Sequence, residues 1–411
     1  MFITPRAGLA AVLLCSTAHA GTTAPTVTAL ASLSPFAGPA LGGLSPDGSG
    51  GFLVNAFTGT ATNKIGAILD LTPPAGGTGA WTTSRVYTFG AGADGVLGAG
   101  LIVPDGQGGL LGETFAGGSA GFGTLFRLVP PAIAGGAWSH SVVYDFTGGA
   151  SGAATPTGNL LSDGAGHFFG TSERGGPGGK GTVYELTQPV TPGGVWTSTV
   201  IASFTGGSVD AAPPQALAMD GAGALYLALA EGGPNHGDGQ VIKLTQSSPG
   251  VWTRTVLHSF GHGKDGSHTA YRVTLDGAGN VYGATYNGGS AGHGIVYELS
   301  AANNYAETIL HDFSGGAADG SAPAGNLILS ADGVLTGTTA AGGTGNAGTV
   351  FTLTPNGAGY DYAVTYNFPA VKAGGVMPKF DLTPSAVAGG FYSLTLKGGA
   401  GDRGYMFEYL P

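Results

Sequence analysis

The sequence predicts an all-β fold, a seven-bladed β-propeller with four antiparallel strands in each blade. Two short phrases each recur seven times along the 411-residue chain, at intervals of 53 to 58 residues. Each repeat holds four apolar runs separated by glycine-rich turn signals, and no stretch beyond the N-terminal segment keeps a helical period. Seven units of four strands are typical of blades arranged radially around a channel.

The third repeat shows the expected order of strands most clearly. An Asp-Gly-Ala-Gly turn at 163–166 separates its first two runs, and glycine takes the positive φ of a tight hairpin without steric cost. The next two runs follow a glycine-rich loop and a longer connection. The four expected strands of this repeat are 159–162, 168–172, 182–186 and 196–204.

The phase of the repeat predicts how the ring closes. The first run after the N-terminal segment, 26–33, has the pattern of an outermost strand, whereas the last run, 405–409, has that of a third strand. The last blade therefore needs the N-terminal strand as its fourth. This pairing would seal the ring and remove two exposed sheet edges.

Composition and charge exclude several kinds of partner. The chain has 81 Gly and 24 Pro, but only 9% of its residues are charged, against roughly 25% in ordinary soluble domains. The net charge is −10, and no basic patch is present. We therefore expect neither nucleic acid nor an anionic membrane surface as a partner.

Residues 1–20 have the pattern of a secretory signal peptide. Arg6 supplies the positive charge, residues 7–15 form a short apolar stretch, and Ala18-His19-Ala20 forms the small-x-small cleavage site. Cleavage would remove Cys15, the single cysteine. We expect residues 21–411 to form one propeller that is secreted to the periplasm or the outside of the cell. We expect it to be a monomer without a transmembrane anchor.

The repeat units resemble those of a known family. Residues 276–289, DGAGNVYGATYNGG, are followed by GIVYEL at 294–299, and such units resemble the Gloeo-Verruco (GloVer) repeat family of exported bacterial proteins. The resemblance covers nearly all of residues 26–411, and the first copy departs most, because residues 57–61 lack the paired glycines. It implies a β-propeller architecture and export, and it implies no particular chemistry.

Several prominent side chains belong to the scaffold by their repeat position. A large aromatic residue lies eight positions before the phenylalanine of the outermost strand in six repeats, which predicts packing between blades. His258 and His311 take the place that tyrosine holds in other outermost strands, and we expect them to be structural. The aspartates of the Asp-Gly turns stabilise those turns. The aromatic residues are Trp81, Trp138, Trp196, Trp252, Tyr305 and Tyr360.

Polar residues that do not belong to the repeat gather on one rim. The loops between blades and the loops joining strands two and three share this rim, here called the top rim, because the chain reverses at each turn. In a chain with 9% charge this clustering is the strongest functional signal. The predicted ligand-binding residues are Glu173, Arg174, Glu231, His236, Asp238, His262, Lys264, Asp265, Tyr286 and Asn287.

A second group should surround the mouth of the central channel. It contains the residue that enters the innermost strand of each repeat. Arg272 and Asp381 are its charged members, and Tyr271 and Lys379 are close to them in sequence; Lys379 and Asp381 complete the predicted ligand-binding set. The seven positions are Gly43, Leu101, Asn159, Ala216, Arg272, Asn326 and Asp381.

Two functions remain open. The first is a non-catalytic module that binds a polysaccharide or a cell-surface ligand through the top rim. The second is a polysaccharide-cleaving enzyme, such as a uronate lyase, at the top rim of blades 4 and 5. A cation, Arg272 or Lys264, would neutralise the uronate, and a histidine or tyrosine would remove the C5 proton. The candidate catalytic residues are His268, Tyr271, Arg272 and His293.

No motif points to a cofactor. The sequence contains no nucleophile elbow, phosphate loop or dinucleotide fingerprint. A hydrolase with paired carboxylates drawn from Glu231, Asp238 and Asp265 is a weaker variant of the enzyme hypothesis. Imidazole and carboxylate groups on the rim would suit zinc or manganese. No close histidine pair fixes a ligand geometry, so no metal site is predicted.

Overall fold

The computed structural model describes most of the chain beyond its N-terminal segment. The predicted signal peptide lies outside the described residues. Within the described part, no helix is long and apolar enough to cross a membrane. The described residues are 24–33, 40–58, 65–76, 79–90, 92–133, 136–207, 210–235, 237–261, 264–269, 272–357, 359–370 and 376–411.

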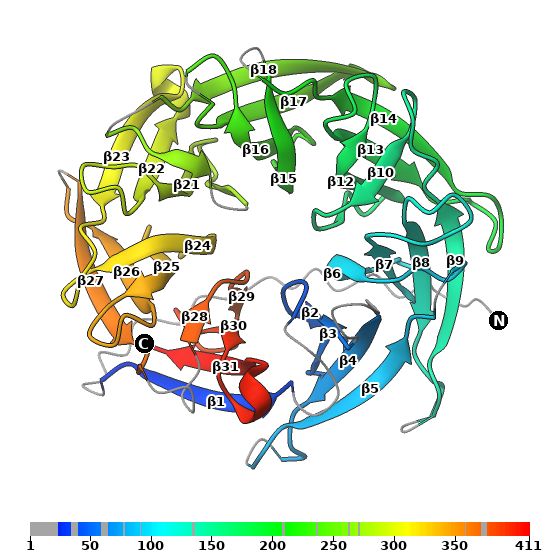
Figure 1. Ribbon diagram of the computed structural model, residues 1–411, viewed down its shortest axis with the longest axis horizontal. Helices are drawn as coiled ribbons and strands as arrows, with labels where there is room; N and C mark the ends of the chain where they lie inside the picture. The colour runs from blue at the N-terminus through cyan, green and yellow to red at the C-terminus, as the bar shows by residue number, and fades with distance from the viewer. Residues whose placement is uncertain are drawn as a thin grey trace, which may run out of the picture.

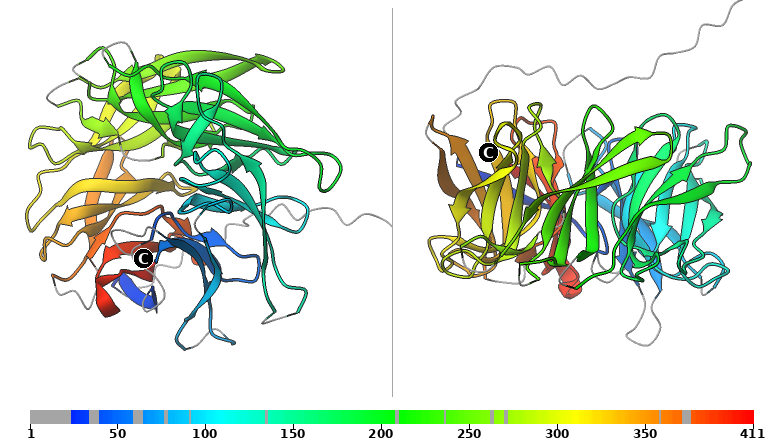
Figure 2. Two further views of the ribbon diagram at one scale, coloured as in Figure 1. Left: turned by 45° about the vertical axis from the view of Figure 1, so that its right-hand side comes forward. Right: turned by 90° about the horizontal axis from the view of Figure 1, so that it is seen from above.

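Seven antiparallel sheets stand around a central channel, so the predicted seven-bladed β-propeller is confirmed (Figure 1). The view from above in Figure 2 shows a thick disc with loops at both rims. The first three blades comprise β2 (Ser45–Pro46), β3 (Phe52–Phe57), β4 (Gly66–Thr72) and β5 (Thr82–Thr88); β6 (Gly98–Pro104), β7 (Leu110–Thr114), β8 (Thr124–Val129) and β9 (Ser139–Asp145); and β10 (Ala153–Pro156), β11 (Leu161–Ser162), β12 (His167–Gly175), β13 (Thr182–Thr187) and β14 (Thr197–Ser203).

The next three blades repeat this order. Two single-turn 3₁₀ helices, Ala301–Asn303 and Ala400–Asp402, lie in connections. Blades 4 to 6 comprise β15 (Ala211–Met219), β16 (Leu225–Gly232), β17 (Gln240–Ser248) and β18 (Val251–Ser259); β19 (Ser267–Thr269), β20 (Thr274–Leu275), β21 (Val281–Asn287), β22 (Ile295–Ser300) and β23 (Ala306–Asp312); and β24 (Gly320–Leu329), β25 (Leu335–Gly342), β26 (Thr349–Pro355) and β27 (Tyr360–Asn367).

Blade 7 is built from both ends of the described chain. It comprises β28 (Val376–Pro378), β29 (Thr383–Pro384), β30 (Phe391–Lys397), β31 (Tyr405–Leu410) and, as its outermost strand, β1 (Thr26–Ser32). Val27 pairs with Tyr409 and Ser32 pairs with Tyr405 in an antiparallel ladder. Val27 packs against the core between blades 6 and 7, and Ala31 is buried in the core between blades 7 and 1. The predicted closure is therefore confirmed.

The innermost strands begin earlier than the sequence indicated. In blade 3 the expected run 159–162 is the second half of a strand that starts at Ala153, and both halves pair with β12. The strand is interrupted where neighbouring blades meet at the channel. A Cβ atom on Gly100 of blade 2 would lie 2.4 Å from the carbonyl oxygen of Gly158 in blade 3. Glycine at this position thus permits an approach that any other residue would block.

The predicted packing of aromatic residues between blades is confirmed. Trp81 stacks on Phe52 of its own blade and lies 6.1 Å, between ring centroids, from Tyr392 of blade 7. Trp252 of blade 4 meets Phe169 of blade 3 in an edge-on arrangement. The phenylalanines that follow the outermost strands are almost completely buried, and each contributes a large apolar area to a blade interface.

One carboxyl group is buried in the interface between blades 2 and 3. The Tyr184 hydroxyl donates a hydrogen bond of 2.5 Å to Glu113 Oε1, and Glu113 Oε2 has no hydrogen-bond partner in the described structure. Burial raises the pKa of Glu113 to about 8, although the hydrogen bond from Tyr184 lowers it in part. The folded ring therefore holds this carboxyl in its neutral form at pH values where an unfolded chain would ionise it.

Removing β1 tests the closure. A chain that lacks Thr26–Ser32 loses one strand of blade 7 and leaves the edge of β31 unpaired, so we expect its melting temperature to fall by about 5 °C or more. Differential scanning calorimetry measures the change, and a chain that begins at residue 24 is the control. An unchanged melting temperature would show that the ring does not depend on this strand.

Replacing Glu113 with Gln tests the buried carboxyl. The folded pKa lies above the unfolded value, so the stability that Glu113 contributes is complete below about pH 4.5 and declines as the pH rises toward 8. Glu113→Gln should melt like the parent protein near pH 5 and at a higher temperature at pH 8. Melting curves from pH 5 to 9 check this, and parallel curves for the two proteins would contradict it.

Candidate functional site

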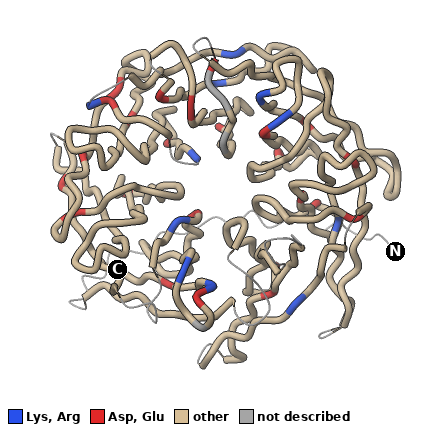
Figure 3. The backbone as a smooth tube through the Cα atoms, viewed as in Figure 1, with Lys and Arg blue, Asp and Glu red and all other residues tan. Residues whose placement is uncertain are grey.

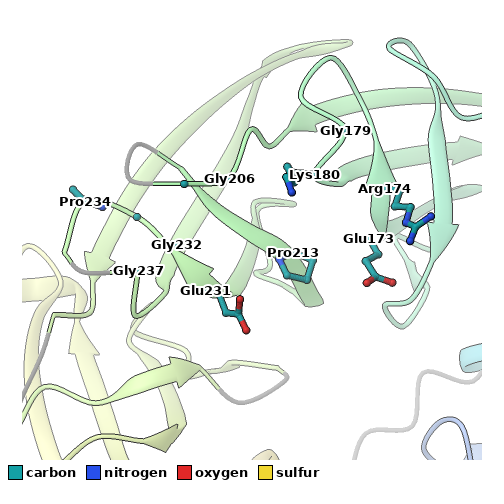
Figure 4. A pocket seen from close by; sticks show the side chains of 12 residues that line it. Glu173, Arg174, Gly179, Lys180, Gly206, Pro213, Glu231, Gly232, Pro234 and Gly237 are labelled. Carbon is teal, nitrogen blue, oxygen red and sulfur yellow. The ribbon is translucent and has the colours of Figure 1, made fainter.

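Charged residues are sparse on this ring, and Figure 3 shows them at wide intervals around it. Against this background, a cavity of about 880 Å³ between blades 3 and 4 carries four of them on the top rim. Glu173 and Arg174 come from the end of β12, Lys180 from the loop that follows, and Glu231 from the end of β16. Figure 4 shows Glu173 and Glu231 on opposite sides of Pro213.

The charges of this cavity are open to solvent. Glu173, Arg174, Lys180 and Glu231 are all exposed. Among the described residues, the side chains of Glu173, Arg174 and Lys180 make no hydrogen bond and no ion pair, and Glu231 Oε1 lies 3.8 Å from His268 Nε2. The remaining lining is glycine and proline, which leaves the backbone accessible. Two acidic and two basic groups are therefore available to a ligand of mixed polarity.

A second cavity, of about 440 Å³, lies at the mouth of the channel. Glu173 and Pro213 line both cavities, so the two are adjacent. The Asn159 amide of blade 3 donates a hydrogen bond of 2.9 Å to Asp381 Oδ2 of blade 7, and an Arg272 guanidinium nitrogen of blade 5 lies 3.9 Å from the same oxygen. Three of the seven expected channel residues thus meet at one carboxylate.

Other predicted residues face the same region. Lys379 lines the channel cavity, and its ammonium lies 5.6 Å from the centre of the Tyr286 ring, within the range of a cation–π contact. Asn287, the next residue, is exposed at the end of β21. These contacts place a basic group beside an aromatic face at the channel mouth.

The two described histidines of the catalytic hypothesis face different neighbours. His268 lies near Glu231 of blade 4, whereas His293 Nδ1 lies 3.0 Å from the Ser321 hydroxyl of blade 6. Arg272 has a different neighbour again, because its guanidinium lies 3.9 Å from the Asp381 carboxylate. The groups required for a lyase are therefore each engaged with a different partner. His236, His262 and Tyr271 lie outside the described residues.

The backbone of His268 is left-handed, with φ of 56°, but this is a feature of the repeat. Thr155, Ala322 and Met377 hold the corresponding places in blades 3, 6 and 7, with φ of 56° to 61°. In each case the backbone N–H donates to a carbonyl of the preceding blade, which for His268 is that of Asp238. The conformation ties blades together and does not mark His268 as a reactive residue.

The remaining rim residues differ in their surroundings. Asp238 is 7% exposed, so its side chain lies inside the rim, whereas Lys264 is exposed. Asp265 Oδ2 accepts a hydrogen bond of 2.8 Å from the Gly261 N–H, and its Oδ1 lies 3.1 Å from His258 Nε2. Asp265 therefore stands at the blade interface and not in either cavity.

Asp265 is also close to a residue that the sequence did not single out. Burial and, to a lesser extent, the neighbouring Asp265 carboxylate together raise the pKa of Glu307 to about 9. Burial also raises the pKa of Asp265, but hydrogen bonds from His258, Glu307 and the Gly261 N–H outweigh it and bring the value to about 2. The two carboxyl groups therefore hold one negative charge between them near neutral pH.

Sequence reasoning also missed Lys180. It is the one charged residue of the glycine-rich loop between β12 and β13, and this contrast with its neighbours was the available signal. Loops of the same kind in the other blades gave no reason to expect that two blades would form a cavity here.

Comparison with known proteins gives a family and a fold. Residues 213–411 match the model of the Gloeobacter/Verrucomicrobia repeat, the family that the resemblance named, although the resemblance was traced over nearly all of residues 26–411. A search of curated proteins gave no match. The extracellular domain described as part of a one-component system of B. thetaiotaomicron superposes with a TM-score of 0.52 at 13% identity. That match covers 90% of this chain and 39% of the other.

Two enzymes of known structure are more distant. A luciferin-regenerating enzyme gives a TM-score of 0.44 at 11% identity, covering 94% of this chain and 95% of its own. A gluconolactonase of Xanthomonas campestris gives 0.40 at 9% identity, covering 94% of each chain. At these identities the likeness concerns the fold alone.

Replacing Asp381 with Ala tests the contact across the channel. The change leaves the Asn159 amide and the Arg272 guanidinium without their shared acceptor, so we expect a loss of about 1–3 kcal/mol in the free energy of unfolding. Asp361→Ala, at an exposed carboxylate that accepts only from Asn356, should change it by less than about 0.5 kcal/mol. Urea unfolding followed by tryptophan fluorescence measures both, and equal effects would argue against the contact.

Proposed function

We propose that the chain, whose residues 213–411 match the model of the Gloeobacter/Verrucomicrobia repeat, is an exported propeller that binds a polar glycan without transforming it. The ligand would occupy the cavity between blades 3 and 4 and extend toward the channel mouth. The observation that carries this proposal is the convergence of four exposed charged side chains on one cavity of about 880 Å³.

The size and lining of the cavity favour a small polar ligand. Pockets for small molecules are commonly about 300–1,000 Å³, and this cavity lies in that range. Glu173 and Glu231 can accept hydrogen bonds from sugar hydroxyls, while Arg174 and Lys180 can donate to ring and hydroxyl oxygens. The glycine-rich walls add backbone N–H and C=O groups. A single-sign ligand would meet repulsion from two of the four charges.

The binding hypothesis draws more support than the uronate-lyase alternative. A lyase needs a cation at the uronate carboxylate and a base within hydrogen-bond reach of the C5 proton. Arg272 lies against Asp381, His268 near Glu231, and His293 beside Ser321. No two of these groups contact each other in the described structure. Export agrees with the N-terminal sequence pattern and remains part of the proposal.

Substitutions at the cavity test the proposed function. The chain without residues 1–20 is screened for retention on insoluble polysaccharides and cell-wall fractions, and dissociation constants are measured for soluble fragments of any glycan that retains it. Glu173→Gln and Lys180→Gln should each weaken binding at least tenfold, which corresponds to about 1.4 kcal/mol. Each substitution removes one charge-assisted hydrogen bond and leaves the size of the side chain nearly unchanged.

A matched control is available in another blade. Lys397 at the end of β30 holds the place that Arg174 holds at the end of β12, and it is exposed and does not line either cavity. Lys397→Gln should bind as the parent protein does. Retention that is equal in all three variants, or no retention on any glycan, would count against the proposal. Release of unsaturated uronate products during the screen would favour the lyase instead.

A further inference from the structure

We propose that His258, Asp265 and Glu307 form a binding site for a divalent transition-metal ion, with zinc as the best fit, and that the ion ties blade 4 to blade 5. His258 belongs to β18, the outermost strand of blade 4, and Glu307 to β23, the outermost strand of blade 5. Asp265 lies in the connection between them. The site is separate from the cavity of the proposed function.

The three side chains converge at distances that suit one ion. One ligand atom from each lies within 4.8 Å of the others. His258 Nε2 is 3.1 Å from Asp265 Oδ1 and 3.9 Å from Glu307 Oε2. Zinc bonds of about 2.0–2.2 Å place neighbouring tetrahedral ligands ~3.4 Å apart. Only small side-chain movements would therefore bring all three atoms into a coordination sphere.

The repeat provides an internal comparison for this cluster. Aspartates of three other interblade connections are met by donors: Asp94 accepts from the Tyr87 hydroxyl, and Asp210 pairs with Arg254 of the following outermost strand. Asp319 lies 3.2 Å from His311, and the nearby Tyr362 of the following strand helps to lower the pKa of Asp319 against the effect of burial.

Glu307 breaks this pattern. It holds on β23 the place that Arg254 holds on β18 and Tyr362 holds on β27, four residues before His311, His258 and Tyr366 respectively. A carboxyl group thus lies beside Asp265 where Arg254 and Tyr362 offer side chains that can donate a hydrogen bond. Two carboxyl groups at this distance require either a shared proton or a cation between them.

An unsatisfied buried oxygen in the cluster also favours a bound cation. Glu307 Oε1 is buried and accepts no hydrogen bond in the described structure. A buried carboxylate oxygen without a donor is unfavourable by about 1–3 kcal/mol, and a metal ion would satisfy it. The side chains of His258, Asp265 and Glu307 are 19%, 27% and 14% exposed, so an ion can reach them from solvent.

The ligand types select the class of ion. One imidazole nitrogen with two carboxylates suits zinc or manganese. Calcium prefers six to eight oxygen ligands, and magnesium is seldom held by imidazole. Three protein ligands leave at least one position for water. Because they come from two blades and the connection between them, the ion would act as a clamp at this interface.

Metal titration tests the proposal directly. The full chain without residues 1–20, free of any affinity tag and stripped with a chelator, is titrated with ZnCl₂ by calorimetry and melted with and without the ion. We expect one site of micromolar or tighter affinity and a rise in melting temperature, with weaker binding of Mn²⁺ and little of Ca²⁺ or Mg²⁺. Glu307→Gln should weaken zinc binding at least tenfold.

Two further variants make the outcome decisive. His258→Tyr copies the Tyr87–Asp94 contact of the first interface, so it should fold, keep the hydrogen bond to Asp265 and lose zinc. His311→Gln alters the equivalent histidine of the next interface and should bind zinc as the parent does. No zinc binding by the parent protein, or equal binding by the parent, Glu307→Gln and His258→Tyr, would overturn the proposal.

Discussion

The pairing of β1 with β31 is the contact on which the ring depends. Every other blade is built from consecutive strands, so its sheet forms from local chain, whereas blade 7 joins residues from opposite ends of the sequence. Closure is expensive in chain entropy because the loop is nearly the whole chain. It is favourable because it completes two apolar interfaces at once, the one that buries Ala31 and the one that holds Val27. Formation of blade 7 therefore couples the folding of the two ends of the chain.

Once the ring is closed, the interfaces between blades decide where variation is tolerated. Their apolar interiors are similar from blade to blade, with a buried phenylalanine after six of the outermost strands and the buried Leu33 after β1. Near the rim, several of the described interfaces have a polar contact of their own, such as Tyr87 with Asp94 or Arg254 with Asp210. A residue that departs from the pattern there is not required by packing. Glu307 and the charged residues beside Pro213 depart in this way, and both proposals rest on them.

The sequence was sufficient to predict the parts of the fold that repeat. Two independent anchors indicated the number of blades, and the phase of the strands indicated the closure, because both depend only on periodicity. The innermost strand was less predictable. Residues 153–156 of blade 3, Ala-Ala-Thr-Pro, lack the β-branched and aromatic character of a strand, because in the ring they lie where neighbouring backbones approach closely. Their strand conformation comes from tertiary contacts and not from local preference.

The same limit applies to the site. Reversal of the chain at each turn was enough to assign Glu173, Arg174 and Glu231 to one rim, and these three do line one cavity. Which pairs of blades separate at the rim depends on side-chain packing, which the repeat spacing does not record. The polar loops of blades 4 and 5 therefore predicted a site there, and Asp265 was predicted to be a rim residue although its carboxylate turns toward His258. The spacing of residues within one repeat does not predict which side chains contact each other between blades.

The two proposed sites are connected through one segment of chain. Asp265 precedes β19, whose His268 lies near Glu231 at the edge of the cavity. An ion held by His258, Asp265 and Glu307 would fix the start of β19 relative to both flanking blades. It would thereby restrict the positions open to His268 and to the carboxylate beside it. In a ring whose blade interfaces have similar apolar interiors, such a clamp would act most strongly on the rim, where apolar packing ends and the charged side chains begin. Metal occupancy and glycan affinity would then be linked, and the coupling would be the same whichever ligand binds first.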